Sequence, residues 1–200
     1  MADVRAGAAT DIDSITAALA RAFHDDPIMH YLFPVPDGRE RKLRSFFASE
    51  AKRSLAKGKL ETAGASTSQG AAIWFGPGHW KLGGFEMLTQ IPMIARFGKY
   101  TPRALRLLGQ IEKVHPKEPH WYLAVLGTDT AHQGKGIGAA LMAPILATCD
   151  EEGLPAYLES SKESNIPFYT RHGFEVTCEV TAKDGPTLWP MYREPRAPES

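Results

Sequence analysis

The chain has 200 residues, of which 43% are apolar, and its 23 Lys and Arg residues balance its 23 Asp and Glu residues. This length and apolar content predict a single domain with one core. The zero net charge disfavours nucleic acid and anionic membranes, so we expect neither as a partner. No stretch approaches the ~20 apolar residues of a membrane span, and residues 1–5 lack an apolar leader, so we expect a cytoplasmic protein.

The N-terminal part of the chain predicts three helices followed by a hairpin. Thr10 can cap a helix whose apolar residues recur at helical spacing as far as Phe23. Pro27 suits the first turn of the next helix, and Gly58 ends a third. In chain order, the predicted elements are a strand at 4–6, helices at about 11–23, 27–32 and 38–57, and strands at 60–63 and 71–75.

The segment 76–119 is too long for an ordinary connection between two strands, so we expect it to contain helices. One helix is expected around residues 85–91, and another presents an apolar face that includes Leu105 and Leu108. This insert is a natural place for substrate specificity to reside, whereas the alternative is that its aromatic residues are ordinary core. The aromatic residues in question are Trp74, Trp80 and Phe85.

The C-terminal part of the chain predicts a strand at 121–126 and then a long helix. This helix starts at Ile137 and stops at Gly153, and Pro144 within it is expected to cause a kink or an early break. The remaining predicted elements are a strand at 156–160, a helix at 166–172, a hairpin of strands at about 174–180 and 187–193, and a disordered tail from Pro195.

Three glycines at alternate positions, Gly134, Gly136 and Gly138, lie between that strand and the long helix. The first amides of a helix lack intrahelical partners and carry the positive end of its dipole, so this turn favours a phosphate. The spacing excludes a Walker-type loop, which ends in Gly-Lys-Ser/Thr. A dinucleotide fingerprint ending at Ala139, with Glu159 on a ribose, fits the pattern, but too few residues follow for further βαβ units. A connection without a ligand is the third interpretation.

Residues 133–138, in which a Gln leads into the glycines, resemble the pyrophosphate-binding motif of the GNAT superfamily of N-acetyltransferases. Downstream, residues 158–161, 165–169 and 173–174 resemble the second half of the same coenzyme A site. Across residues 116–191 the sequence is similar to the branch that contains puromycin N-acetyltransferase. The resemblance therefore covers the C-terminal part of the chain, whereas the acceptor is usually read by the N-terminal part.

The resemblance implies a single α/β (α+β) domain over residues 1–194, with a mixed central sheet whose central strands splay apart between flanking helices. The segment 76–119 becomes a helical insert between the third and fourth strands, and 195–200 a disordered tail. The implied cosubstrate is acetyl-CoA, without a metal. The implied acceptor is a primary amine on a small molecule, with an antibiotic-like molecule as one option, and this amine attacks directly in a ternary complex. Alternatives are a protein lysine or N-terminal acetyltransferase and a non-catalytic coenzyme A sensor. Both a monomer and a homodimer are compatible with the sequence.

The resemblance also assigns the coenzyme A contacts. The pantetheine arm is expected beside Leu126, Gly127 and Thr128, and Asn165 is expected to help hold the coenzyme, unless it only caps a helix. Lys135 is either a phosphate contact or a solvated charge, and we favour the solvated charge. The residues expected to surround the pyrophosphate are Gln133, Gly134, Lys135, Gly136, Ile137, Gly138 and Ala139.

Two residues are candidates for catalysis. Tyr169 matches the family tyrosine near the sulfur, where a phenol can protonate the departing thiolate; the alternative is a core aromatic residue. Many family members carry a carboxylate on the central strand, but residues 121–127 contain none. Glu159, on the next strand, is therefore the candidate general base, with a structural ion pair as the alternative. The two cysteines and seven histidines lack ligand spacing, so no metal ligand is assigned.

Overall fold

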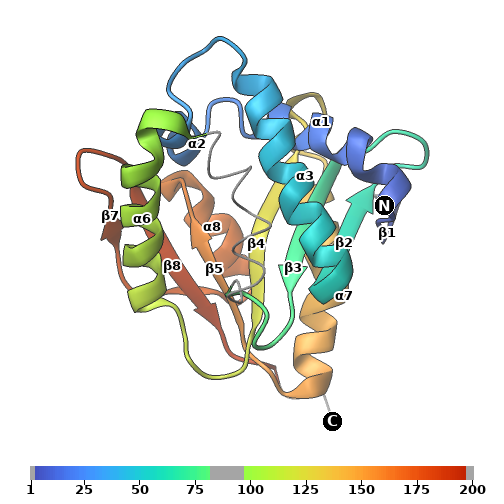
Figure 1. Cartoon of the computed structure of the whole chain (residues 1–200). Coiled ribbons are helices and arrows are strands. Elements are labelled where there is room, and N and C mark those ends of the chain that lie inside the picture. Colours follow the sequence, from blue (N-terminus) through green and yellow to red (C-terminus); the bar gives the residue numbers. More distant parts are fainter. Residues whose placement is uncertain (1–2, 82–96, 197–200) are drawn as a thin grey trace.

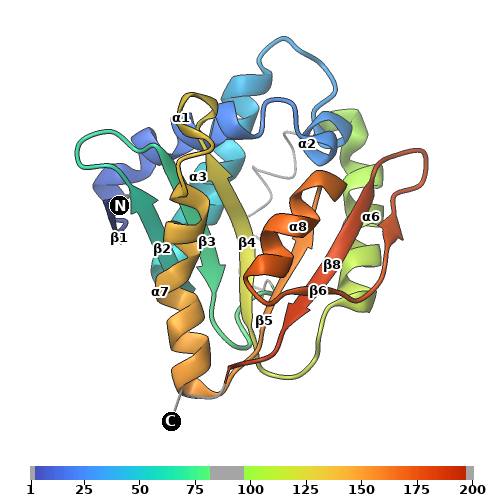
Figure 2. The same ribbon diagram turned by 180° about the vertical axis from the view of Figure 1, so that it is seen from behind.

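The computed structural model describes residues 3–81 and 97–196 and contains one mixed sheet with helices on both faces (Figures 1 and 2). The strand order is β1-β2-β3-β4-β5-β8-β6, and β7 pairs with β8. β4 and β5 are parallel, whereas every other neighbouring pair is antiparallel. The strands are β1 (Val4–Ala6), β2 (Gly58–Ala63), β3 (Gly70–Phe75), β4 (Trp121–Thr128), β5 (Ala156–Ser160), β6 (Glu175–Val176), β7 (Val180–Thr181) and β8 (Thr187–Arg193).

The helices divide between the two faces of the sheet. α1, α2, α3 and α6 lie in front of it in Figure 1, and α7 and α8 lie in front of it in Figure 2. Each face therefore has its own apolar core, one under α1 and α3 and one under α7 and α8. The helices are α1 (Ile12–Ala22), α2 (Pro27–Leu32), α3 (Arg39–Lys57), α6 (Thr101–Val114), α7 (Ile137–Glu152) and α8 (Ile166–Arg171). Short 3-10 turns are η1 (Ala9–Asp11), η2 (Gly98–Tyr100), η3 (Thr130–His132) and η4 (Glu163–Asn165).

The two central strands separate along their length. β4 pairs with β3 from Tyr122 to Thr128, but it pairs with β5 only from Trp121 to Leu123. Figure 2 shows the two strands diverging beyond this short contact. The predicted α/β fold with splayed central strands is therefore confirmed.

A β-bulge in β4 accompanies the separation. Ile73 of β3 lies opposite Val125, but its neighbour Trp74 lies opposite Leu123, so Ala124 is an extra residue in β4. Side chains in a regular strand alternate between faces, yet Ala124 and Val125 both pack against the core under α1 and α3. Because a bulge bends its strand and increases its twist, β4 turns away from β5 where the pairing ends.

Most of the elements predicted from the sequence are present with small shifts of their ends. Among them, α2 starts at Pro27, and α7 ends at Gly153, which has φ +64° in the left-handed region as a helix C-cap often does. The helix expected around residues 85–91 lies outside the described residues, as do residues 197–200. The domain boundary at 194 stays a prediction.

Three local predictions were wrong. Thr10 lies inside η1 and caps nothing; Asp11 instead accepts a hydrogen bond from the backbone N–H of Ala8 (2.8 Å). The early break at Pro144 is absent, because a proline removes a single backbone bond and the apolar packing on both sides of it persists; the kink expected as the alternative stays a prediction. The strand expected at 174–180 is two short strands, β6 and β7, that pair with opposite ends of β8.

The apolar face predicted for α6 is also only partly right. Leu107 is buried, and Ala104 and Ile111 pack against the first core. Leu105 and Leu108, however, are 53% and 57% exposed. The helix thus buries the narrow stripe around Leu107, whereas Leu105 and Leu108 form a second apolar stripe that lines a cavity.

An ion pair between a buried arginine and a half-buried aspartate holds β8 to the end of α7. The guanidinium of Arg193 donates to both carboxylate oxygens of Asp150 (2.8 Å each) and to the carbonyl of His172 (3.0 Å), and the arginine is 2% exposed. This contact holds the pKa of the Asp150 carboxyl below its usual range. Asp150 also accepts a bond from the Arg196 backbone N–H (2.7 Å). Since β8 is the outer neighbour of β5, the pair supports the strand beside the splay.

We predict that Arg193→Met lowers the free energy of unfolding by about 1.5–3 kcal/mol at neutral pH, because charged hydrogen bonds are lost. The matched control is Arg5→Met, which removes an equally bidentate but exposed pair with Asp11 and should cost far less. Urea unfolding measures both losses. The folded-state pKa of Asp150 is lowered, so its contribution is present at neutral pH and fades as pH falls through that lowered value. Equal losses for the two variants, or a loss for Arg193→Met that persists in acid, would contradict this account.

Candidate active site

A cavity of about 1120 Å³ occupies the space where β4 and β5 diverge. Its lining runs from the glycine loop before α7, along the free end of β4, to the facing surfaces of α2 and α6. One end is therefore made of loop backbone, and the other end is apolar. The residues predicted for the coenzyme and for catalysis line this one cavity, with the exception of Lys135, which is exposed and lies outside the lining.

The glycine loop presents backbone to the cavity because of its left-handed turns. Gly134 and Gly136 have φ values of +76° and +77°, and Gly136 is the N-cap of α7. Other residue types rarely adopt this conformation. A Cβ added at either position would have nothing within 4 Å, so open space lies over the loop. The loop thus has the shape of an anion site at a helix N-terminus.

Side-chain contacts hold the end of β4, which leads into this loop, on both sides. Gln133 donates from its side-chain amide to the Thr128 carbonyl (3.2 Å), and Asp129 forms an ion pair with Arg21 of α1 (2.6 Å). This ion pair lowers the pKa of Asp129. Gly127 permits close contact with α1, because a Cβ there would lie 2.7 Å from the Phe23 ring. The glycine at 127 is thus required by packing.

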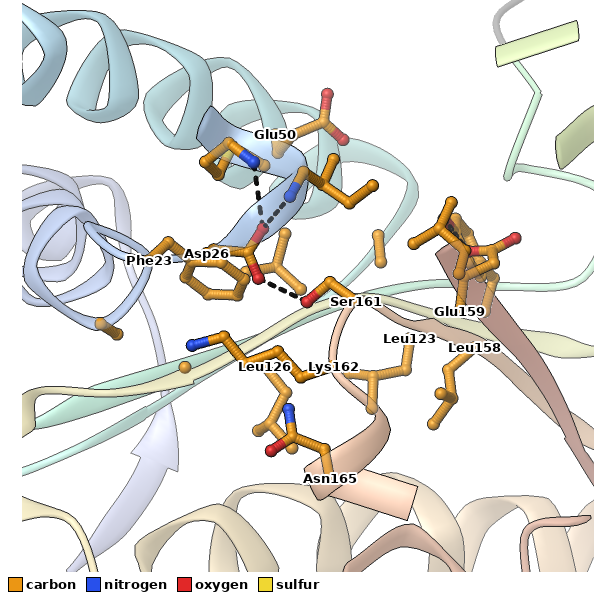
Figure 3. A pocket seen from close by; sticks show the side chains of 18 of the residues that line it. Phe23, Asp26, Glu50, Leu123, Leu126, Leu158, Glu159, Ser161, Lys162 and Asn165 are labelled. Atoms are coloured by element: carbon orange, nitrogen blue, oxygen red, sulfur yellow. Dashed lines mark hydrogen bonds between the residues drawn. The ribbon is translucent and has the colours of Figure 1, made fainter. Parts of the chain in front are cut away.

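α8 brings two predicted residues to the cavity. Asn165 precedes the helix, yet its side chain makes no capping hydrogen bond, and Figure 3 shows it extending toward Leu126. Tyr169 is 9% exposed. Burial, followed by the charge of Asp26, raises the pKa of Tyr169 well above its usual value, so its hydroxyl stays protonated at neutral pH.

A contact that the sequence did not predict bridges the cavity. Asp26 lies between α1 and α2, and one carboxylate oxygen caps α2 by accepting bonds from the N–H groups of Ile28 (2.9 Å) and Met29 (3.0 Å). Its other oxygen accepts a hydrogen bond from the Ser161 hydroxyl, just beyond β5 (Figure 3). Because 135 positions separate the partners, no local pattern could have predicted this bond.

Glu159 of β5 lies in a second, buried polar cluster. Its side chain is 7% exposed, and it accepts a hydrogen bond from the Tyr122 hydroxyl (2.8 Å). Its second oxygen lies 3.4 Å from His115 Nδ1. His115 Nε2 in turn lies 3.0 Å from His120 Nε2. Burial and the Glu159 charge raise the pKa of Tyr122 well above its usual value, so the phenol acts as the donor.

The aromatic residues proposed for specificity divide into different roles. Trp74 is fully buried in the second core. Trp80 lines the cavity and stacks on His115 with ring centroids 3.7 Å apart. Arg53 of α3 holds this arrangement by donating to the carbonyls of Trp80 (3.2 Å) and His79 (3.3 Å). Phe85 lies outside the described residues.

Large apolar side chains of α6 and α2 form the apolar end of the cavity. Leu105 and Leu108 of α6 face it, opposite residues of α2. Two acidic residues also line the cavity, and each is paired with a cation, Glu50 with Arg53 (2.8 Å) and Glu112 with Lys81. The α2 residues that line this end are Ile28, Met29 and Leu32.

Within 3–81 and 97–196, no group of three or more His, Cys, Asp or Glu residues is arranged to hold a metal ion. No helix in this part of the chain is long and apolar enough to cross a membrane.

Comparison with known proteins identifies the class. A family model described as the acetyltransferase (GNAT) domain matches residues 102–195. An uncharacterised N-acetyltransferase of Schizosaccharomyces pombe is 30% identical over 180 residues, which cover 83% of this chain and 71% of that protein. The chain therefore belongs to the GNAT family of N-acetyltransferases. It is an acetyl-CoA-dependent acyltransferase.

Solved structures agree with this assignment. The structure of a histone acetyltransferase HPA2 and related acetyltransferase from Corynebacterium glutamicum has a TM-score of 0.76 and 26% identity, covering 100% of this chain and 99% of that one. Arylalkylamine N-acetyltransferase 2 of Aedes aegypti shares the fold at a TM-score of 0.64 and 12% identity, covering 98% and 99%. PaiA N-acetyltransferase of Thermoplasma acidophilum, solved with coenzyme A, shares it at 0.60 and 13%, covering 97% and 99%. The puromycin N-acetyltransferase branch stays a prediction.

Proposed function

We propose that this enzyme transfers the acetyl group of acetyl-CoA to the primary amine of a small molecule with an apolar body. The observation that carries the proposal is the apolar end of the cavity, where Leu105 and Leu108 are exposed on α6 opposite α2. Exposed leucines that line a concave site indicate an apolar ligand.

The other end of the cavity is proposed to hold the coenzyme. The amides of the glycine loop and the N-terminus of α7 would bind the pyrophosphate, with contacts from Gln133 to Ala139. The pantetheine arm would lie in the splay, where Leu126, Gly127 and Thr128 have no β5 partner. Asn165 would hold the arm from the opposite side, since its side chain is not used in capping. Lys135 is proposed to remain a solvated charge.

The proposed chemistry uses two side chains. Glu159 removes a proton from the ammonium of the acceptor, and the neutral nitrogen attacks the thioester carbonyl, forming a C–N bond. A backbone N–H of the free end of β4 stabilises the oxyanion. The C–S bond then breaks, and Tyr169 donates its proton to the departing thiolate. The proton that the nitrogen loses after attack restores Tyr169, so the products are the amide and the free thiol.

The raised pKa of Tyr169 is compatible with this role. Burial disfavours an anion of either partner, so a thiolate formed in the same apolar surroundings is also more basic than in water. Burial therefore raises the pKa of the Tyr169 phenol and the pKa of the coenzyme thiol together. Burial also keeps the phenol protonated until the thiolate appears, as a donor requires.

A protein acceptor is the second candidate function. It is favoured by one comparison, because the similar structure from Corynebacterium glutamicum carries the name of a histone acetyltransferase. A peptide needs an open groove, whereas the cavity here is bounded by α2 and α6 on one side. A coenzyme A sensor without catalysis is the third candidate.

A panel of primary amines assayed for release of the coenzyme A thiol separates these candidates. We expect amines with aromatic or branched apolar bodies to be acetylated faster than methylamine, and puromycin belongs in the panel. A lysine peptide and a whole lysate, each incubated with labelled acetyl-CoA, form the second arm. Acetylation of peptides alone would replace the proposal with a protein acceptor. Coenzyme A binding without thiol release in either arm would favour the sensor.

The anion site is tested by Gly136→Ala. A Cβ at φ +77° costs roughly 1–2 kcal/mol of strain and shifts the amides of the loop, so the Kd for coenzyme A should rise about tenfold or more. Gly153→Ala is the matched control, because Gly153 has φ +64° at the other end of α7, outside the cavity. Calorimetry should show weak binding only for the first variant. Equal affinities in the two folded variants would refute the proposed pyrophosphate site.

The acid is tested by Tyr169→Phe, which removes only the hydroxyl. We expect kcat to fall by about 10²–10⁴-fold with little change in coenzyme A affinity. An acyl donor with a more acidic thiol needs less protonation and should recover part of the rate. Tyr192→Phe, which removes a hydroxyl outside the cavity lining, is the control. A loss of only a few-fold in Tyr169→Phe would return this residue to a packing role.

The base is tested by Glu159→Gln, which keeps the size of the side chain and removes its charge. The rate should fall most at pH values below the pKa of the acceptor amine, where proton removal is needed. Asp26→Asn is the comparison, because Asn is also a good N-cap and Asp26 is the other carboxylate beside the splay. If Glu159→Gln keeps the acidic limb of the wild type and Asp26→Asn loses it, Asp26 is the base.

A further inference from the structure

His115 is a buried histidine that the proposed chemistry does not yet use. Its side chain is fully covered, with Trp80 stacked on one side and Tyr157 and Tyr122 edge-on around it. Its Nδ1 atom and Glu159 Oε1 are both buried, and neither has a hydrogen-bond partner among the described residues. These two atoms face each other at 3.4 Å.

The positions of the hydrogens follow from the far end of the cluster. His120 Nδ1 lies 2.7 Å from the Glu118 carbonyl, which can only accept, so Nδ1 carries a hydrogen. Burial lowers the pKa of His120, so this ring is neutral and its Nε2 has a lone pair. His115 Nε2 lies 3.0 Å away and must therefore be the donor. His115 Nδ1 is left to face Glu159.

The gap between His115 Nδ1 and Glu159 Oε1 can hold one hydrogen or none. With none, His115 is neutral, Glu159 is a carboxylate and two lone pairs face each other. With one, the gap closes as a hydrogen bond in which either atom carries the proton. The second Glu159 oxygen is already engaged by the Tyr122 hydroxyl, which fixes the orientation of the carboxylate. The pair can therefore accept a proton when no hydrogen lies between His115 Nδ1 and Glu159 Oε1.

We propose that His115 and Glu159 act as one proton-accepting pair, in which Glu159 accepts the proton of the acceptor amine and His115 supplies the second site for that proton. This inference rests on the proposed function and deepens it. Glu159 takes one proton from the ammonium, and this proton is shared across the gap while the neutral nitrogen attacks. After turnover the pair releases it to solvent, so no other reactant is needed. His115 is a positioning residue, since it acts through Glu159.

Other titratable groups surround the pair and set its environment. α3 contributes Glu50 and Arg53, which pair with each other and thereby add no net charge. The strands contribute two phenols whose pKa values are raised by burial and then by the charge of Glu159, and the segment before β4 contributes a neutral imidazole. Among the described residues these groups are Tyr122, Tyr157, His120, Glu118, Glu50, Arg53 and, near Tyr157, Cys178.

Two substitutions at His115 test the pair because each removes the second site for the proton. His115→Phe keeps a ring between Trp80 and Tyr157 but can neither share the proton nor face Glu159 with a lone pair. Glu159 alone should hold the proton less tightly than the pair, so the acidic limb of the kcat profile should move to lower pH by about one unit. His115→Asn places a permanent amide donor near the site of Nδ1, which favours the carboxylate and should also move the limb to lower pH. A limb that moves to higher pH in His115→Phe would show that His115 does not help to hold the proton.

The controls separate this inference from the proposed function. His24→Asn changes an exposed histidine outside the cavity and should leave the limb in place. If Glu159→Gln abolishes the limb but both His115 variants keep the wild-type midpoint, only the pairing is wrong. If Glu159→Gln leaves the limb unchanged, the base of the proposed function is wrong as well.

A measurement on the wild-type protein does not depend on how the variants fold. In the coenzyme A complex labelled with ¹⁵N at histidine, the Nδ1 resonance of His115 should titrate with the midpoint of the acidic kcat limb. Its Nε2 should stay protonated throughout. A Nδ1 that keeps one protonation state across the whole limb would overturn the pairing.

Discussion

The separation of β4 from β5 after Leu123 is the constraint on which the rest of the structure depends. Parallel neighbours normally exchange hydrogen bonds along their shared length, and buried backbone groups left without a partner are costly. Here the bulge at Ala124 bends β4 away while β3 follows it to Thr128. The backbone on the open side of β4 therefore lines a cavity, and we propose that the pantetheine arm of acetyl-CoA supplies the missing partner.

Contacts between distant segments hold the two halves of the sheet around this opening. The Arg21–Asp129 pair fixes α1 to the end of β4, and the partly buried Arg193–Asp150 pair fixes β8 to α7. Asp26 and Ser161 join across the opening itself. The cavity consequently has two unlike ends, with left-handed glycines and a helix N-terminus at one and the leucines of α6 at the other. This asymmetry is what the proposed transfer from a phosphorylated donor to an apolar amine requires.

The parts of the fold that local chemistry determines could be predicted from the sequence. The glycine loop, the start of α2 at Pro27 and the end of α7 at Gly153 depend on neighbouring residues alone. The parts that depend on distant partners could not. His115 lies just after α6 and Glu159 lies on β5, so their contact depends on how these two elements pack, and no spacing in the sequence relates them. Trp74 and Trp80 look alike in the sequence, but one fills the core and the other covers His115.

Amide hydrogen exchange with and without coenzyme A tests the central claim most directly, because it reports on the open backbone itself. The account predicts slower exchange in peptides that cover residues 124–128 of β4 and the loop 133–139 when coenzyme A is bound. Peptides from β1 and β2, which lie on the far edge of the sheet, should exchange at unchanged rates. Protection that appears elsewhere while residues 124–128 exchange as in the free protein would contradict the account.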